Sequence, residues 1–129
     1  MRINLTSVLV DDQAKALKFY TEVLGFAKKQ DVPLGEHRWL TVVSKEGDAD
    51  VQLLLEPMAF EPARIYQKAL FDAGIPCTAF GVDDCHAEYD RLRAHGVVFR
   101  GTPTAMGPTI VARFEDTCGN LIQIVQLRS

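Results

Sequence analysis

An internal repeat constrains this chain more than any other feature. Val10-Asp11-Asp12 in the first half returns as Val82-Asp83-Asp84 in the second, at an offset of 72 residues. A helix-like run follows each copy and ends in Leu24-Gly25-Phe26 in the first half and in residues 95–99 in the second. A supersecondary unit that is used twice buries its apolar face against its own copy. We therefore expect equivalent positions of the two copies to converge on a shared cavity, which is where function is sought.

The size and composition of the chain are those of one soluble globular domain. Its 129 residues are 47% hydrophobic and 24% charged, with a formal net charge of −3. No apolar run approaches the ~18 residues that span a bilayer, and no signal-peptide apolar stretch follows Met1. Lys and Arg form no cluster of the kind that binds nucleic acid. We expect a cytoplasmic protein that binds neither membranes nor nucleic acid.

The apolar pattern predicts the same order of elements in each half. In the first half, strands at 3–10, 26–32, 38–44 and 50–56 accompany a helix that Asp11 or Asp12 caps and Gly25 ends. In the second half we predict a strand at 77–82, a helix at 84–94, strands at 97–100, 109–114 and 121–127, and a hairpin turn at 116–120. Residues 101–108 are expected to form a loop, either a plain solvent loop or a lid over the cavity.

A connector helix at 60–74 is expected between the halves, with an apolar face of Ile65, Tyr66, Ala69 and Leu70. The predicted organisation is one domain, residues 1–129, comprising module one (1–59), the connector helix (60–74) and module two (75–129). The three cysteines, Cys77, Cys85 and Cys118, match neither a disulfide framework nor a zinc pattern, so free thiols are expected.

Motifs in both halves resemble one known family. Val10-Asp11-Asp12, Phe19-Tyr20 and Val23-Leu24-Gly25-Phe26 resemble the helix signature of the vicinal-oxygen-chelate superfamily, which includes the glyoxalases, the bleomycin resistance proteins and the extradiol dioxygenases. Residues 116–123 are similar to that group's closing turn and the strand after it. The resemblance implies an α+β fold of two tandem βαβββ modules, forming an open, partly barrel-like mixed sheet of eight strands with helices outside. It also implies a homodimer.

The metal-dependent members of this superfamily take one ligand from the first strand and one from the last strand of each module. Counting from the repeated motif puts these four positions at Leu5, Gln52, Cys77 and Gln123. Leucine cannot bind a metal, and a neutral amide oxygen is a weak ligand compared with imidazole or carboxylate. The resemblance therefore implies that the usual metal site is lost, and we predict no metal and no cofactor.

A relocated ion is an alternative, held by His37, Glu56 and Cys77. The other histidines, His86 and His95, lie nine residues apart on the predicted helix and hence on opposite faces of it, so they cannot share an ion.

Seven residues are candidates for the lining of the cavity. Alternation along a strand puts Gln52 and Glu56 on one face. Gln123 lies among aliphatic residues of its strand, and a buried amide there needs a hydrogen-bond partner. The two glutamines either satisfy each other or orient a ligand. Trp39 is either a core residue or a stacking platform, Cys77 either a small apolar residue or a nucleophile, and Arg113 needs either Glu56 or a ligand anion as its partner. The candidates are Leu5, Trp39, Gln52, Glu56, Cys77, Arg113 and Gln123.

Two functions remain open at this point. The first is a metal-free protein of this superfamily that binds a small organic molecule with an aromatic or apolar body. The second is a lyase, isomerase or dioxygenase of the same superfamily that holds a divalent metal with unusual ligands. The sequence contains no catalytic triad, phosphate loop or dinucleotide motif that points to another class of enzyme.

Overall fold

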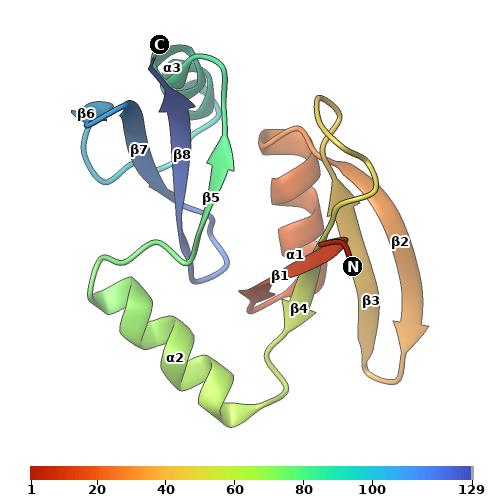
Figure 1. Ribbon diagram of the computed structural model, residues 1–129. Helices are drawn as coiled ribbons and strands as arrows, with labels where there is room; N and C mark the ends of the chain where they lie inside the picture. Colours follow the sequence, from red (N-terminus) through yellow and green to blue (C-terminus); the bar gives the residue numbers. More distant parts are fainter. Residues whose placement is uncertain (129) are drawn as a thin grey trace. The chain divides into compact units, whose positions relative to one another are not determined.

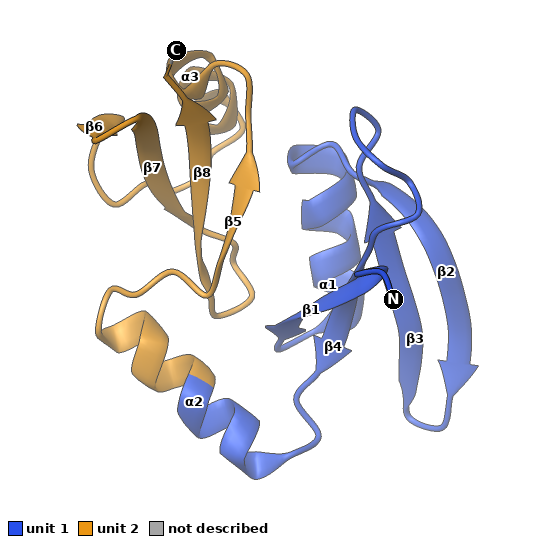
Figure 2. Cartoon of the chain, in the orientation of Figure 1, with its two compact units in different colours: residues 1–66 blue, residues 67–129 orange. Residues whose placement is uncertain are grey.

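The computed structural model describes residues 1–128, and the chain divides into two compact units. Unit 1 comprises residues 1–66 and unit 2 residues 67–129, and the boundary between them falls inside helix α2 (Glu61–Asp72), as Figure 2 shows in blue and orange. Each unit contains its own four-stranded mixed sheet. In the described part of the chain, no helix combines the length and the apolar character needed to cross a membrane.

Unit 1 follows the predicted order of elements. Strand β1 (Leu5–Val10) leads into helix α1 (Gln13–Lys18) and a π-helical turn, η1 (Phe19–Val23). Strands β2 (Ala27–Leu34), β3 (His37–Val43) and β4 (Gln52–Pro57) complete the unit in the sheet order β1-β4-β3-β2. Strand β1 runs parallel to β4, and the other pairs are antiparallel. Figure 1 shows α1 lying along one face of this sheet.

The first helix begins and ends at identifiable residues. The Asp12 side chain accepts a hydrogen bond from the Lys15 amide at 3.1 Å, so Asp12, and not Asp11, is the cap. The Leu24 amide reaches back five residues to the Phe19 carbonyl, which makes the last turn π-helical, and Gly25 then adopts a φ of +92°. Tyr20 is fully buried in this turn. The apolar spacing predicted the helix but does not distinguish an α-helical turn from a π-helical one.

Unit 2 repeats this topology. Strand β5 (Thr78–Gly81) leads into helix α3 (Cys85–Ala94), which Asp84 caps through the Ala87 amide. Strands β6 (Thr104–Met106), β7 (Thr109–Glu115) and β8 (Leu121–Leu127) follow, in the sheet order β5-β8-β7-β6. The sheet of unit 1 has the same order with the same parallel pair, so the prediction of an α+β fold built from two βαβββ modules is confirmed.

Residues 97–108 differ from the prediction. The strand expected at 97–100 reduces to a single bridge between Phe99 and Phe114, and the expected loop at 101–108 contains β6, which pairs with β7. The Phe99 ring lies 4.6 Å from the Tyr89 ring and 5.5 Å from the Phe114 ring, centroid to centroid. Two backbone hydrogen bonds also tie this segment to β7, from the Arg100 amide to the Arg113 carbonyl (2.8 Å) and from the Glu115 amide to the Val98 carbonyl (2.9 Å). Pro103 and Pro108 flank β6, and proline is tolerated beside a short edge strand.

The connector helix α2 also departs from the prediction in its buried face. Ile65 and Tyr66 are exposed, and the buried residue is Gln67. The Gln67 Nε2 donates to the Cys118 carbonyl and to the Asn120 Oδ1, both at 3.1 Å, so this helix is anchored to the β7–β8 turn by an amide and not by an apolar stripe.

Candidate functional site

In unit 1, four of the candidate residues share the sheet face that is free of helices. Leu5 lies opposite Gln52 in the β1–β4 ladder, and alternation places Glu56 on the same face. Thr41 lies opposite Leu54, so Trp39, two residues before Thr41, belongs to this face as well. Helix α1 packs against β3 and β4. The buried residues on the other face are Val8, Val10, Leu40, Val42, Leu53 and Leu55.

In unit 2, the remaining three candidates share the equivalent face. Arg113 lies opposite Gln123 in the β7–β8 ladder, and Ala79 of β5 lies opposite Gln123 on the other side. Cys77 precedes Ala79 by two residues and has the same orientation. Helix α3 packs against β7 and β8, where Phe114, Ile122 and Ile124 are buried. The structure therefore brings four candidates together in unit 1 and three in unit 2, in each case away from the helix.

The two ladders differ in register, which the counting did not anticipate. In unit 1 the first-strand position Leu5 is the partner of Gln52, whereas in unit 2 the partner of Gln123 is Ala79, two residues beyond Cys77. The Cys77 amide instead donates to the Leu121 carbonyl at 3.0 Å. Counting equal distances from the repeated motif therefore predicts the sheet face on which Cys77 lies, but it does not predict which residue lies opposite Gln123 in the ladder.

Gln52 finds its partner within its own sheet. The hydroxyl of Thr41, a fully buried residue, donates to the Gln52 Oε1 at 2.7 Å and accepts the Gln30 amide at 3.1 Å. The Gln30 side chain in turn accepts the Trp39 indole N–H at 2.9 Å. The sequence analysis missed Thr41 and Gln30, and the only signal for Thr41 was a hydroxyl residue inside the apolar run at 39–43.

The other candidates of unit 1 are less constrained. Leu5 is 39% exposed, and Glu56 is half-buried near the end of β4. Among residues 1–66, no Lys, Arg or His side chain forms an ion pair with Glu56.

Gln123 binds a cationic side chain. The Arg113 Nε donates to the Gln123 Oε1 at 3.1 Å, and the Arg113 Nη1 donates to the Gly74 carbonyl at 3.4 Å. Both acceptors are neutral, so the charge of the half-buried guanidinium is not compensated by them. Glu115, the nearest acidic residue along β7, pairs with Arg100 at 3.2 Å.

Cys77 does not have the character of a nucleophile. Although the residue as a whole is exposed, the protein packed around its sulfur and, to a lesser extent, the nearby Asp116 carboxylate together raise the pKa of the thiol to about 11. Cys85 is fully buried, and desolvation raises the pKa of its thiol as well. Both thiols are neutral at pH 7, and a thiol attacks as the thiolate.

The residues at the superfamily's metal positions do not fit a divalent cation. Leu5 has no donor atom, and the Oε1 of Gln123 already accepts from a guanidinium, whose positive charge would repel a metal ion bound to the same oxygen. The Oε1 of Gln52 is occupied by the Thr41 hydroxyl. Over residues 1–128, no three His, Cys, Asp or Glu side chains gather in a group that could hold a metal.

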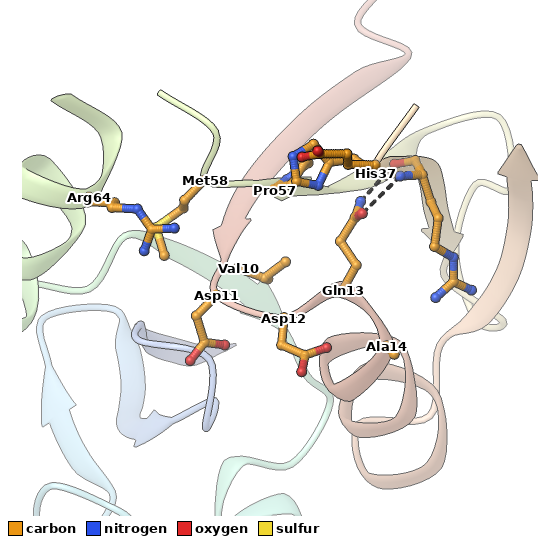
Figure 3. A pocket seen from close by; sticks show the side chains of 11 residues that line it. Val10, Asp11, Asp12, Gln13, Ala14, His37, Pro57, Met58 and Arg64 are labelled. Carbon is orange, nitrogen blue, oxygen red and sulfur yellow. Dashed lines mark hydrogen bonds between the residues drawn. The ribbon is translucent and has the colours of Figure 1, made fainter. Parts of the chain in front are cut away.

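A separate pocket of about 290 Å³ lies in unit 1, at the start of α1 and the tip of the β2–β3 hairpin (Figure 3). The pocket is lined by residues 10–14, 36–38, 57, 58 and 64. His37 is among them, but none of the seven candidate residues is. Its floor is held by Gln13, which the sequence analysis did not single out. The Gln13 Nε2 donates to the carbonyls of Arg38 (2.7 Å) and Leu55 (2.8 Å), and its Oε1 accepts the Arg38 amide at 2.9 Å.

Two ion pairs involve side chains that line this pocket. Asp11 pairs with Lys15 at 3.0 Å, and Asp31 receives two hydrogen bonds from the Arg38 guanidinium, at 3.0 and 2.7 Å. These bonds hold the pKa of Asp31 down at about 2. Of the other charged residues that line the pocket, Glu36 and Arg64 form none of the ion pairs found within residues 1–66.

Comparison with known proteins agrees with the fold and the motifs. The chain is 54% identical over 126 residues to YurT of Bacillus subtilis (strain 168), covering 98% of this chain and 99% of that protein. It is 31% identical to a probable lactoylglutathione lyase of Synechocystis sp., covering 96% and 94% of the two chains. The crystal structure of TnmS3, an antibiotic binding protein from Streptomyces sp. CB03234, matches with a TM-score of 0.75 and 30% identity, covering 98% of this chain and 96% of that one.

A family model matches residues 2–124 and therefore nearly the whole chain. Together with the paired βαβββ modules, this match shows that the chain belongs to the Glyoxalase/Bleomycin resistance protein/Dioxygenase superfamily.

Proposed function

We propose that this protein is a metal-free member of the superfamily that binds a small organic molecule on the helix-free faces of its sheets. The observation that carries the proposal is the contact between Arg113 and Gln123, which puts a fixed cation on the oxygen that a metal ion would need. Leu5, with no donor atom, supports it from the other module. The seven candidate residues then serve as lining and orienting groups rather than as ligands of an ion.

The similarity to TnmS3 supports the binding part of this proposal, because that protein is an antibiotic binding protein with the same fold. The helix-free face of unit 1 offers surface of the matching kind. The Trp39 indole is half-buried with its N–H held by Gln30, and apolar side chains such as Val32 (50% exposed) lie on the same face. An aromatic or apolar ligand body would pack against such a surface.

One observation favours the alternative of a metal-dependent enzyme. The Synechocystis relative, which is similar over nearly the whole chain, is named a probable lactoylglutathione lyase. An enzyme of this kind would require an ion held by ligands other than the four positions derived from the repeat.

The test compares ligand binding with and without a chelator. The purified protein is screened by thermal shift against a panel of aromatic antibiotics and aromatic acids in EDTA, and after dialysis against Mn²⁺, Ni²⁺, Zn²⁺ or Fe²⁺, with elemental analysis of the protein as isolated. We expect at least one compound to raise the melting temperature equally in both conditions. A stoichiometric ion, or lactoylglutathione formation that EDTA abolishes and a metal restores, would overturn the proposal in favour of the enzyme.

The proposal extends to a homodimer in the cytoplasm. In each sheet two strands lie at the edges, β1 and β2 in unit 1 and β5 and β6 in unit 2, and exposed edges are commonly covered by a partner. Light scattering is expected to give twice the chain mass of 14.3 kDa, and a monomer at micromolar concentration would contradict this part of the proposal.

A further inference from the structure

Unit 2 carries a positive charge on its helix-free face that no carboxylate among residues 67–128 neutralises. Arg113 projects from the middle of β7 and is half-buried. Its acceptors are an amide oxygen of Gln123 and the backbone carbonyl of Gly74, and neither carries a charge. Within residues 67–128, the ion pairs are Lys68–Asp72, Arg91–Glu88 and Arg100–Glu115, and Arg113 takes part in none of them.

The two carboxylates next to Arg113 along the chain are already engaged. Glu115, on the same face of β7, pairs with Arg100 at 3.2 Å. The side chain of Asp116 is fully buried and accepts the amides of Cys118 (2.8 Å) and Asn120 (3.0 Å) and the Asn120 Nδ2 (2.8 Å). These contacts commit Asp116 to the β7–β8 turn. Neither carboxylate is available to Arg113, so an anion that neutralises the guanidinium would come from outside residues 67–128, and such a pair is stronger at a half-buried charge than at an exposed one.

The surroundings of Arg113 suit the rest of an organic anion. Val111 and Val125 lie opposite each other on the same face, two residues from Arg113 and Gln123. Ala79, the partner of Gln123 on β5, presents only a methyl group. The Cys77 thiol on this face is neutral at pH 7, so it adds no negative charge that would repel an anion.

We propose that Arg113, positioned by Gln123, binds the carboxylate end of an amphipathic organic acid whose apolar body packs on the helix-free face of unit 2. The inference rests on the proposed function and adds the charge class of the ligand. A guanidinium presents its N–H groups as a planar fork that matches a carboxylate, and an apolar setting strengthens the pair. Gln123 is a positioning residue, since it fixes the guanidinium by accepting from Nε and leaves the Nη2 edge without an acceptor among residues 67–128.

The experiment uses two probes of the same ring system and nearly the same shape, the anion 2-naphthoate and its neutral amide, 2-naphthamide. Both are titrated calorimetrically into the full-length protein at pH 7 in EDTA. We expect the wild type to bind the acid at least about tenfold more tightly than the amide, which corresponds to one charge-assisted contact. Equal affinities for the two probes would overturn the inference while leaving the proposed function intact. Binding of neither probe would count against both.

Three variants locate the preference at the proposed site. Arg113→Gln removes the charge and is expected to weaken binding of the acid to the level of the amide. Gln123→Glu keeps the arginine but supplies an internal carboxylate opposite it, and it is expected to remove the preference in the same way. The matched control is Arg91→Gln, which removes an arginine of the same unit that pairs with Glu88 on helix α3, away from the helix-free face, and the preference should survive. Melting curves verify folding, and persistence of the preference in a folded Gln123→Glu protein would overturn the inference.

Discussion

The Arg113 Nε and the Gln123 Oε1 lie 3.1 Å apart across the β7–β8 ladder, directly opposite each other. In unit 1 the glutamine has a neutral partner instead, because the Gln52 Oε1 accepts a hydrogen bond from the Thr41 hydroxyl at 2.7 Å. The two glutamines that the sequence marked as a matched pair therefore have different electrostatic surroundings. One belongs to a polar network around Trp39, and the other holds a cation.

Replacing Trp39 by alanine should weaken binding of the neutral aromatic compounds that the thermal-shift screen selects, because the proposed function assigns the half-buried Trp39 ring to the binding surface of unit 1. Trp39→Phe keeps an aromatic surface but loses the hydrogen bond to Gln30, so it should retain most of the affinity. Calorimetric titration of the two variants measures the difference. Equal losses in both would mean that the indole N–H, and not the ring surface, matters.

The Cys77 thiol should react slowly with iodoacetamide at pH 8. Its pKa of about 11 leaves far less thiolate than an unstructured cysteine has, so alkylation should be roughly a hundredfold slower than that of a cysteine peptide. Mass spectrometry of the modified protein, with Cys77→Ser as the control, measures the rate at this residue. A rate like that of the peptide would contradict the desolvated setting of the thiol.

The Asp31–Arg38 pair should make stability depend on pH at the acid end. The pKa of Asp31 is about 2 in the folded protein, below its ordinary value of 3.8, so the stabilisation is complete above about pH 4 and disappears as the pH falls through 2. NMR titration of the carboxyl should give this low midpoint, and Arg38→Gln should return it toward 3.8. An unchanged midpoint in the variant would show that the guanidinium is not the cause.

Gly119→Ala should destabilise unit 2 more than the φ angle alone explains. The added Cβ would lie 2.6 Å from the Gln67 Oε1, and displacing that side chain breaks its bonds to Cys118 and Asn120. Gly25→Ala is the control, because Gly25 has a similar φ (+92° against +98°) with no atom within 4 Å of the new Cβ.

Urea denaturation should show that Gly25→Ala lowers the free energy of unfolding by roughly 1–3 kcal/mol, because alanine is strained at a positive φ. Gly119→Ala should lower the free energy of unfolding by about 1–3 kcal/mol more, because the polar groups of Cys118 and Asn120 lose their hydrogen bonds to Gln67. Similar losses in the two variants would mean that Gln67 moves aside without cost.

Much of the fold was predictable because its signals are local. The aspartates of the repeated motif cap both helices, and glycine and asparagine at 116–120 form the β7–β8 turn. Alternation along β4, β7 and β8 placed the candidate side chains on the correct faces. The prediction for residues 97–108 was wrong because contacts with other parts of the chain position this segment, among them the packing of Phe99 on Tyr89 and Phe114.

The amino-acid sequence by itself determined two βαβββ modules, their helix caps and the face on which each candidate lies, since these follow from spacing, periodicity and capping within short windows. Only the tertiary structure decided which group satisfies each glutamine: Thr41 for Gln52 and Arg113 for Gln123. The physical reason is register. A partner across a ladder is chosen by where two distant strands align, and the alignment of β5 with β8 differs by two residues from the one that equal counting implies.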